Sequence, residues 1–550
     1  AAYLGGVVFF TLATHWVRVA HPMMHFSWLG LAVVMPLFWL AALAILRRLD
    51  RAGLPLALSV PVAWVAMEYF RMHFPTGFPF MKHVGAYQMI GFGWYYLGYT
   101  QHDFLTLIQI ADLGGVYAVS FVVAAVNGAV AGVWLGRQTH PPTPSLQEGG
   151  EAEKQPTPTA PLPERKGELS ATVADNGPAF VASKAVSPLP FSERMGGLGF
   201  AALLLAASLG YGAYRLDHPP FADGPRVAAI QGDVSQGDKM ARGNTLVRSY
   251  SKVFAQAYRL DPPVDLIVWP ETCYWEDWFE VGPGVSPESA SRYREEFARA
   301  DKEFRVKWQV PVLFGLSGHE WDGRRVWKYN SALLVGPDAP DPIRYDKMHL
   351  VPFGEYVPLG DELPFMKWFT PYKHDYSCRP GERWTGFPLT ARDGRAFTFA
   401  CLICYEDSDT YLARQYVKDR PPGAGGDLPS SAKKPVNFLV NISNDGWFNG
   451  TEEHEQHLAI CRFRAVETRR AVVRSVNMGI SGVIDPDGRV IALPDPDWGK
   501  SKKVEAVVSA VVPIDTRPSA YAAWGDWGPA SCWLVALLGA ILARFRQTPA

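Results

Sequence analysis

The chain has 550 residues, which is too long for one compact core, so we expect two or more domains. Its formal net charge is −1 and no folded segment concentrates positive charge, which excludes an electrostatic case for nucleic-acid binding. The mean hydropathy of −0.03 averages two kinds of sequence. A very apolar first third and an apolar tail enclose an ordinary globular middle, which predicts a membrane part and a globular part.

Six apolar stretches approach the ~20 residues that are needed to cross the hydrocarbon of a bilayer. A basic cluster at Arg47, Arg48 and Arg51 follows the second stretch, and the basic run "ARFRQ" follows the last. Because basic flanks stay in the cytoplasm, both ends of a six-span chain are predicted inside and the globular middle outside. The predicted spans are roughly 3–20, 28–47, 55–70, 111–136, 196–216 and 527–544.

The span at 55–70 is the weakest, because it contains two prolines and Glu68. Its alternative is a buried core helix. Glu68 is a candidate functional group inside the membrane or a partner of nearby Arg71. The chain opens within apolar sequence, without an initiator methionine or signal peptide, so we expect residues 1–136 to be an N-terminally incomplete set of transmembrane helices.

The next segment, 137–194, is rich in Pro, Ser, Thr and Glu and is predicted to be a disordered cytoplasmic loop. One transmembrane helix is expected at 195–217, a globular extracytoplasmic domain at 218–523 and a last transmembrane helix at 524–546.

Short apolar runs alternate with helical patterns in the globular part, which predicts a layered α/β domain. An insert rich in Pro and Gly at 418–434 is expected to be an exposed loop. The predicted helices are 249–260, 289–306 and 453–475, and the predicted strands are 226–234, 264–272, 310–318, 329–337, 397–406, 436–445 and 479–491.

Two of the six cysteines stand three residues apart in "FACLICYED". The run reads as a buried strand, and side chains alternate faces along a strand, so Cys401 and Cys404 are expected on opposite faces. They then share neither a zinc ion nor a disulfide. Cys404, near the carboxyl end of the strand where α/β sites lie, is the candidate nucleophile.

A thiol needs a base or a cation nearby to act as a nucleophile at neutral pH. Glu271 ends the apolar run "LIVWPE", where loss of water is expected to raise the carboxyl pKa toward that of a general base. Lys347 and Glu355 lie in "YDKMHLVPFGEYVP", and an ammonium beside the thiol would stabilise a thiolate and an oxyanion. The alternatives are a capping or salt-bridged glutamate and a solvated lysine.

Together, "WPE", "YDKMHLVPFGEYVP" and "CYE", in that order, resemble the nitrilase (carbon–nitrogen hydrolase) superfamily. With spans on both sides, the chain is similar to the apolipoprotein N-acyltransferase family, also through "NISNDGWF" and "MEYFRMHFPTGFPF". The resemblance implies an αββα sandwich for 218–523. It makes Glu271 the general base, Lys347 the oxyanion and thiolate stabiliser and Cys404 the nucleophile.

In the same way, Glu355 becomes the glutamate that orients the lysine and the reacting groups. Five residues are implied to shape the pocket or bind substrate: Tyr405, Glu406, Asn444, Trp275 and Trp447. Alternatives stay open for them. Asn444 could instead belong to a turn, and Glu406 could pair with an arginine. The two tryptophans lie in aromatic loops and could simply pack against the sandwich or the membrane plane.

The activity that the resemblance implies moves an acyl chain from a membrane glycerophospholipid, through a cysteine thioester, to the N-terminal amine of a diacylglyceryl-cysteine apolipoprotein. The protein is then a monomer in the inner membrane of a bacterium, with its catalytic domain on the periplasmic face and no cofactor or metal. One alternative is a membrane-tethered amidase with the same three residues. Another is a transporter with an attached binding domain, against which stands the scarcity of ionisable residues in the spans.

The remaining cysteines and two histidines complete the candidates. Cys273 and Cys378 fit either a disulfide or free thiols, whereas Cys461 and Cys532 are expected to be packing residues. "EHEQH" lacks the two-histidine spacing of zinc proteases, so His454 and His457 are expected on a helix surface rather than at a metal.

Overall fold

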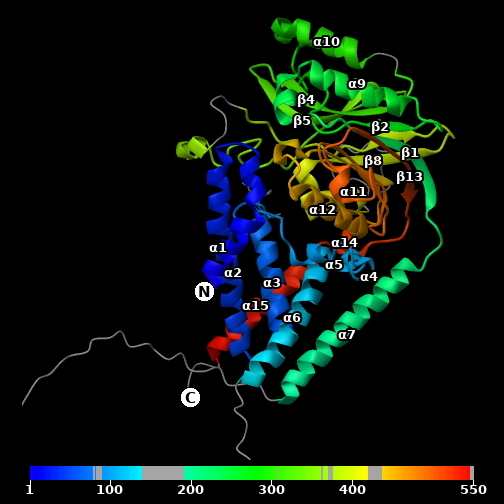
Figure 1. The fold of residues 1–550 in the computed structure, drawn as a ribbon. Coiled ribbons are helices and arrows are strands. Elements are labelled where there is room, and N and C mark those ends of the chain that lie inside the picture. The colour runs from blue at the N-terminus through cyan, green and yellow to red at the C-terminus, as the bar shows by residue number, and fades with distance from the viewer. Residues whose placement is uncertain are drawn as a thin grey trace, which may run out of the picture.

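The computed structural model describes residues 1–78, 81, 90–138, 191–305, 308–337, 339–360, 363–369, 376–418 and 436–545. Nearly all of the predicted loop at 137–194 and of the predicted insert at 418–434 lies outside these residues. The described chain has a helical part, in the lower half of Figure 1, and a β-sheet part, in the upper half.

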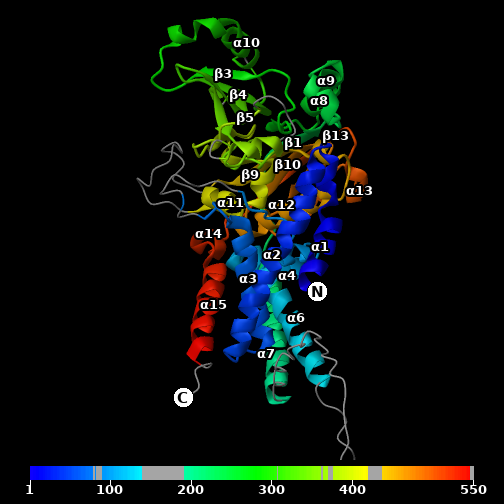
Figure 2. The same ribbon diagram turned by 90° about the vertical axis from the view of Figure 1, so that its left-hand side faces the viewer.

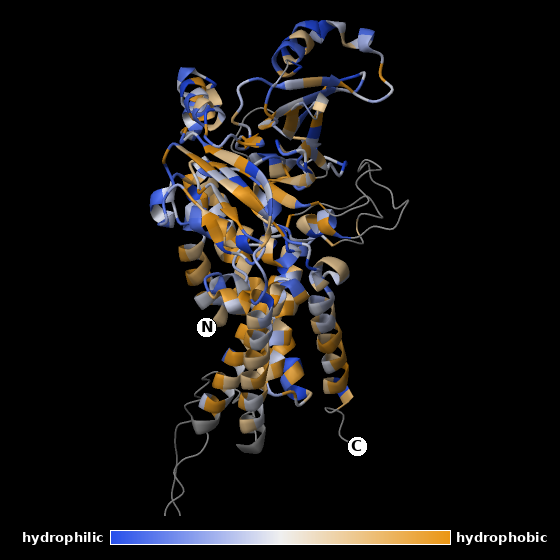
Figure 3. Ribbon diagram, turned by 90° about the vertical axis from the view of Figure 1, so that its right-hand side faces the viewer, coloured by the Kyte–Doolittle hydropathy of each residue, from blue (hydrophilic) through white to orange (hydrophobic). Residues whose placement is uncertain are grey.

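The helical part is a bundle of neighbouring helices, one of which slants away from the others (Figures 1 and 2). By length and composition, four helices of the described residues are apolar enough to cross a bilayer: 24–51, 116–135, 195–216 and 527–545. The hydrophobic colours of Figure 3 gather on these helices. The bundle contains α1 (Ala2–Ala13), α2 (Met24–Arg51), α3 (Leu56–His73), α6 (Val116–Gln138), α7 (Phe191–Leu216) and α15 (Trp527–Phe545).

Three of the six predicted spans differ in the structure. The one at 3–20 is wrong as a single helix, because α1 stops at Ala13 and the chain continues as a 3-10 turn over His15–Val19. The one at 55–70 corresponds to α3, which is mostly buried and lies outside the length and composition limits that the four apolar helices meet. Its Glu68 accepts hydrogen bonds from Trp64 Nε1 (2.9 Å) and from the Leu97 backbone (2.6 Å).

Gly115 divides the predicted span at 111–136. Its φ of +70° ends the short helix α5 (Ala111–Gly114) before α6 begins, and a Cβ there would lie 2.9 Å from the Tyr521 ring. Two further short helices, α4 (Leu105–Ile108) and α13 (Trp498–Ser501), lie elsewhere in the chain.

Two mixed β-sheets form the other part. One has the strand order β13-β1-β2-β4-β5-β6, with β3 paired to β4, and the other β12-β11-β10-β9-β8-β7. The first contains β1 (Ala222–Gln231), β2 (Leu266–Val268), β3 (Trp278–Val281), β4 (Val312–Trp321), β5 (Val326–Gly336), β6 (Ala339–Asp346) and β13 (Ala506–Ile514). The second contains β7 (Phe387–Thr390), β8 (Ala396–Ile403), β9 (Phe438–Asn444), β10 (Val472–Asn477), β11 (Gly482–Ile484) and β12 (Val490–Ala492).

Helices cover both outer faces of this pair of sheets, so the predicted αββα sandwich is confirmed. The first sheet carries α8 (Gln236–Ala241), α9 (Asn244–Tyr258) and α10 (Arg294–Phe304). The second carries α11 (Thr410–Val417), α12 (Glu453–Thr468) and α14 (Ala520–Trp524), which lie between the sandwich and the membrane helices in Figure 1.

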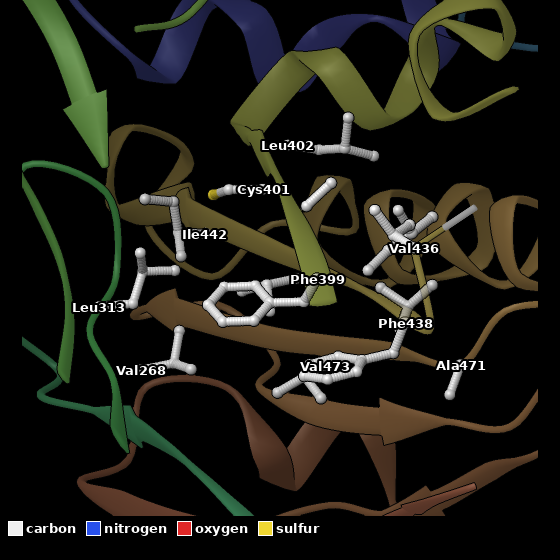
Figure 4. Close-up of a cluster of buried hydrophobic side chains, with 14 of the residues drawn as sticks. Val268, Leu313, Phe399, Cys401, Leu402, Val436, Phe438, Ile442, Ala471 and Val473 are labelled. Carbon is white, nitrogen blue, oxygen red and sulfur yellow. The ribbon is translucent and has the colours of Figure 1, made fainter. Parts of the chain in front are cut away.

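The core of the sandwich is the apolar layer between the sheets. Val268 and Leu313 of the first sheet face Phe399, Cys401 and other residues of the second (Figure 4). Each such side chain contributes about 1.5–3 kcal/mol on burial. Cys401 therefore lies in the core, as its place in an apolar strand predicted.

The predicted helix at 453–475 is wrong over its last residues. Arg469, with φ +52°, ends α12 after Thr468, and residues 472–477 form β10 between β9 and β11. The run "AVVRS" carries β-branched residues that suit a strand, and pairing with two neighbours decides the outcome.

Candidate active site

A cavity of about 670 Å³ lies where loops of both sheets meet the start of helix α2. Glu271, Lys347, Glu355 and Cys404 all line it, although Glu271 and Cys404 lie 133 positions apart in the sequence. Glu271 follows β2, Lys347 and Glu355 follow β6, and Cys404 follows β8, because the two sheets bring these strand ends to one edge of the sandwich. The structure thus gathers the four side chains that the sequence analysis nominated.

Glu271 sits in a tight turn that follows β2, with Thr272 in the left-handed region at φ +47°. Gly315 on the neighbouring strand allows this turn to lie close, since a Cβ there would be 2.1 Å from the Pro270 carbonyl oxygen. The Glu271 carboxylate accepts a hydrogen bond from the backbone N–H of Asn444 at 3.0 Å. Main-chain geometry therefore fixes the direction of this carboxylate.

Lys347 is buried between two carboxylates. Its Nζ lies 3.2 Å from Glu271 Oε1 and 2.9 Å from Glu355 Oε2. Asn330 Nδ2 donates to both carboxylates, at 2.6 Å each. Sequence reasoning missed Asn330, and the signal was a lone amide within the apolar strand "YNSALLVG". The four groups form one hydrogen-bonded cluster.

The pKa of Glu271 shifts in the direction opposite to the one expected from the sequence. Burial raises the pKa of the Glu271 carboxyl, but Lys347, Lys239 and the hydrogen bond from Asn330 outweigh it and hold the pKa below its usual range. The prediction of a raised pKa was wrong, because it considered loss of water without the paired ammonium. Burial lowers the pKa of Lys347, yet Glu271 and Glu355 raise it well above its usual value, so the lysine is charged.

Cys404 is the first residue after β8, not a strand residue as predicted, and begins a 3-10 turn over Cys404–Ser408. Its φ of +52° lies in the left-handed region, which is strained for a cysteine and aims the side chain away from the strand. Burial and Glu271 raise the pKa of the Cys404 thiol well above its usual value, and Lys347 offsets them only in part. The resting sulfur is therefore protonated and needs a base.

Glu406 is completely buried and pairs with backbone groups rather than with an arginine. Its carboxylate accepts hydrogen bonds from the backbone N–H of Met348 (2.7 Å) and of Ile403 (2.7 Å) and from the Tyr345 hydroxyl (2.9 Å). These contacts join the residue after Lys347 to the residue before Cys404. Glu406 therefore positions these two segments, and it is not among the residues that line the cavity.

The other four nominated residues divide into two pairs. Asn444 and Trp447 line the cavity. Tyr405 instead turns toward the helical part, where its hydroxyl donates to the Gly91 carbonyl (2.8 Å) and its ring stacks on Trp94. Trp275 packs against Tyr274, with ring centroids 4.6 Å apart, and is not among the residues that line the cavity.

A buried charged cluster supports the far side of the Cys404 turn. His457 lies between Asp407 and Asp445, with nitrogen–oxygen distances of 2.9 and 3.1 Å, and Arg474 contacts the same carboxylates at 3.2 and 3.0 Å. Burial and Arg474 lower the pKa of His457, but the two aspartates outweigh them and raise it to about 10. Two cations thus balance two carboxylates.

The surface prediction for His454 and His457 was therefore wrong, since both are buried. Helix α12 is enclosed by the second sheet on one side and by the helical part on the other, so it has no free face at these positions. Possible ligand atoms of Asp445, Glu453 and His457 lie within 4.8 Å of one another, but Arg474 and the charged His457 already neutralise the aspartates.

All six cysteines lie in the described part of the chain, and none forms a disulfide. Cys378 lines the cavity and Cys273 is buried beside the Glu271 turn, so the free-thiol alternative holds for both. Cys461 and Cys532 are buried packing residues, as predicted.

Comparisons with known proteins agree with this architecture. The model of the family "Apolipoprotein N-acyltransferase N-terminal domain" matches residues 1–129, and that of the family "Carbon-nitrogen hydrolase" matches residues 226–420 and 428–516. A protein of Geobacter metallireducens named apolipoprotein N-acyltransferase is 30% identical over 92% of this chain and 77% of its own length. The chain belongs to the apolipoprotein N-acyltransferase family.

Two further family members show the same extent of similarity. Apolipoprotein N-acyltransferases of Methylococcus capsulatus and Caulobacter vibrioides are 27% and 26% identical, over 89% and 99% of this chain and 74% and 85% of their own lengths. With its spanning helices and its carbon–nitrogen hydrolase domain, this member of the family is a membrane-bound acyltransferase.

Proposed function

We propose that this protein transfers an acyl chain from a membrane glycerophospholipid to the N-terminal amine of a diacylglyceryl-cysteine apolipoprotein. Membership of the family supports this proposal. The observation that carries it is the cavity, in which a protonated cysteine, a carboxylate and a charged lysine meet at the start of membrane helix α2. Such a site suits substrates whose reacting groups lie at the bilayer surface.

In the first half-reaction, the Cys404 sulfur attacks the ester carbonyl of the phospholipid and its proton passes to the Glu271 carboxylate. The Lys347 ammonium stabilises the oxyanion, and Glu355 and Asn330 hold that ammonium and Glu271 in place. Glu271 then gives the proton to the departing glycerol oxygen. The products are a lysophospholipid and a thioester on Cys404.

In the second half-reaction, the uncharged α-amine of the apolipoprotein attacks the thioester carbon. Glu271 takes a proton from this nitrogen and returns it to the departing Cys404 sulfur, which restores the thiol. The second half-reaction thus yields the amide product and the resting enzyme. A buried cluster that excludes water favours the amine over hydrolysis.

The placement of charges supports an orientation with the sandwich on the periplasmic face of the inner membrane. Met24, at the start of α2, lines the cavity, so Arg47 and Arg48 lie toward the opposite end of the bundle. Leu49 packs there against Gly539 of α15, which brings the basic ends of both helices together. Basic residues at the end distant from the sandwich agree with a cytoplasmic location of that end.

Intact-protein mass spectrometry tests the proposal. The purified full chain is incubated with a phospholipid, and we expect an acyl-sized mass increase that hydroxylamine removes and that maps to the peptide with Cys404. Addition of a diacylated lipopeptide should discharge it as an amide. Cys401→Ala is the matched control and should retain the label, whereas a label that persists in Cys404→Ala would refute the assignment.

A further inference from the structure

The cavity carries more positive charge than the proposed chemistry uses. Among the described residues that line it, six are Lys or Arg and two are carboxylates, Glu271 and Glu355. Both carboxylates engage Lys347, and Arg242 is paired with Asp277 at 2.7 Å. Lys239 turns inward and donates to Thr272 Oγ1. Three cations remain at the rim: Arg325, Lys328 and Arg379.

A single tryptophan holds two of these cations together. The Arg325 guanidinium lies over the Trp327 ring at 3.2 Å from its centroid, and the Arg379 guanidinium lies at 4.9 Å. Trp327 is itself fixed, because its Nε1 donates to Asp322 at 2.7 Å. Cation–π contacts of this kind offset part of the repulsion between two like charges.

The third cation is tied to the second through the main chain. The backbone N–H of Arg379 donates to the Lys328 carbonyl at 2.7 Å, and that of neighbouring Cys378 donates to the Glu355 carbonyl at 2.8 Å. The segment with Arg379 is thus held between strand β5 and the loop of the catalytic cluster. The cationic rim has a defined position relative to Lys347.

Little negative charge compensates this rim within the described residues. Arg379 approaches Glu382 only at 3.8 Å, in a pair that is largely exposed and contributes little. No carboxylate of the described chain lies within ion-pair distance of Arg325 or Lys328. The Asp322 carboxylate accepts from Trp327 and from the backbone N–H of Arg324 and Arg325.

Part of the lining is apolar. Ala20, shortly before helix α2, and Met24, the first residue of that helix, line the cavity, as do Phe353, Trp447 and Phe448. One cavity is therefore lined by cationic side chains, by apolar side chains and by the reacting groups of the proposed chemistry. This combination matches an amphiphile that has an anionic head and an apolar chain.

We propose that Arg325, Lys328 and Arg379 bind the phosphodiester of the acyl donor. The inference rests on the proposed function. Glycerol separates the ester carbonyl from the phosphate by only a few bonds, so a donor ester at Cys404 places its phosphate within the same cavity. Guanidinium groups match phosphate oxygens in geometry and charge. The rim thus selects donors by their phosphate, whatever the substituent beyond it.

Single-turnover acylation of the full-length protein in mixed micelles tests this assignment. The donors are phosphatidylethanolamine, phosphatidylglycerol and an uncharged p-nitrophenyl ester of the same fatty acid. We compare wild type with Arg325→Gln, Arg379→Gln and the double variant. Arg324→Gln is the matched control, because Arg324 is exposed in the same hairpin and does not line the cavity as described.

We expect each single variant to require a roughly tenfold higher concentration of either phospholipid for half-maximal acylation, as expected for a lost charge-assisted hydrogen bond. Acylation by the uncharged ester should stay unchanged, as should all activities of Arg324→Gln. The wild-type preference for phospholipid should weaken with salt, and that of the double variant should weaken less, because only Lys328 of the three cations remains.

Three outcomes would overturn parts of the reasoning separately. Equal losses with phospholipid and uncharged ester would show a structural defect, and unchanged phospholipid use in the double variant would show that the rim does not bind phosphate. Each refutes the inference and leaves the proposed function standing. Absence of a thioester in wild type with every donor would instead refute the proposed function.

Discussion

Lys347 is the strongest single test of the catalytic cluster, because one buried ammonium faces two carboxylates. The side chain is 1% exposed and lies within 3.2 Å of both Glu271 and Glu355. Lys347→Met removes the ammonium group and keeps most of the length of the side chain, so little packing is lost. Breaking a buried ion pair in this way costs about 3–5 kcal/mol of unfolding free energy.

The loss should depend on pH in a defined direction. The pKa of Glu271 is lowered in the wild type, so its pairing stabilises the fold above its ordinary value of 4.5 and ceases to do so as pH falls through the lowered pKa. The deficit of Lys347→Met should thus be full at neutral pH and shrink below pH 4.5. Thermal unfolding of the detergent-solubilised protein, followed by tryptophan fluorescence, measures it.

A second substitution separates charge from packing. In the Lys347→Met background, Glu355→Gln removes one of two carboxylates that no longer have a counter-charge, so we expect it to recover at least about 1 kcal/mol. In the wild-type background the same change should destabilise, because it removes a partner of the lysine. If Glu355→Gln lowered stability equally in both backgrounds, the ammonium would not couple the two carboxylates and the reasoning would fail.

Four further changes test neighbouring features. Cys404→Ala should abolish the thioester without unfolding, whereas Cys401→Ala, in the core between the sheets, should keep turnover and lose about 1 kcal/mol on thermal unfolding. Asn330→Ala should slow acylation about tenfold in stopped-flow assays, because each carboxylate then loses one of the hydrogen bonds that orient it. His457→Asn should destabilise most below pH 6.5, with the difference from wild type disappearing as pH rises through about 10, the pKa of His457; a constant difference would contradict a charged histidine.

The sandwich was predictable because its strands are short apolar runs whose polar successors collect at one edge. That rule pointed to Glu271, Lys347 and Cys404 before any coordinates. The predictions that were wrong concern properties that depend on contacts with residues distant in the sequence. The direction of the Glu271 pKa required the position of Lys347, and the burial of His457 required the helices packed against α12.

Local patterns were also insufficient where two structures compete. Residues 472–475 continue a helical periodicity, and only pairing with the neighbouring strands β9 and β11 makes them part of strand β10. Asn330 looked like an ordinary strand residue, since one sequence does not reveal that two carboxylates converge on its amide. The left-handed backbone at Cys404 was likewise invisible, because it arises where β8 must turn abruptly.

The wall that Ala20 and Met24 contribute means that neither part of the chain holds a finished pocket. A sandwich released from its helices would keep every reacting group yet leave the sulfur open to bulk solvent, where an acyl thioester is hydrolysed. Under the proposed function, the helical part would therefore contribute to the reaction as well as to anchoring, because it supplies part of the lining of the cavity.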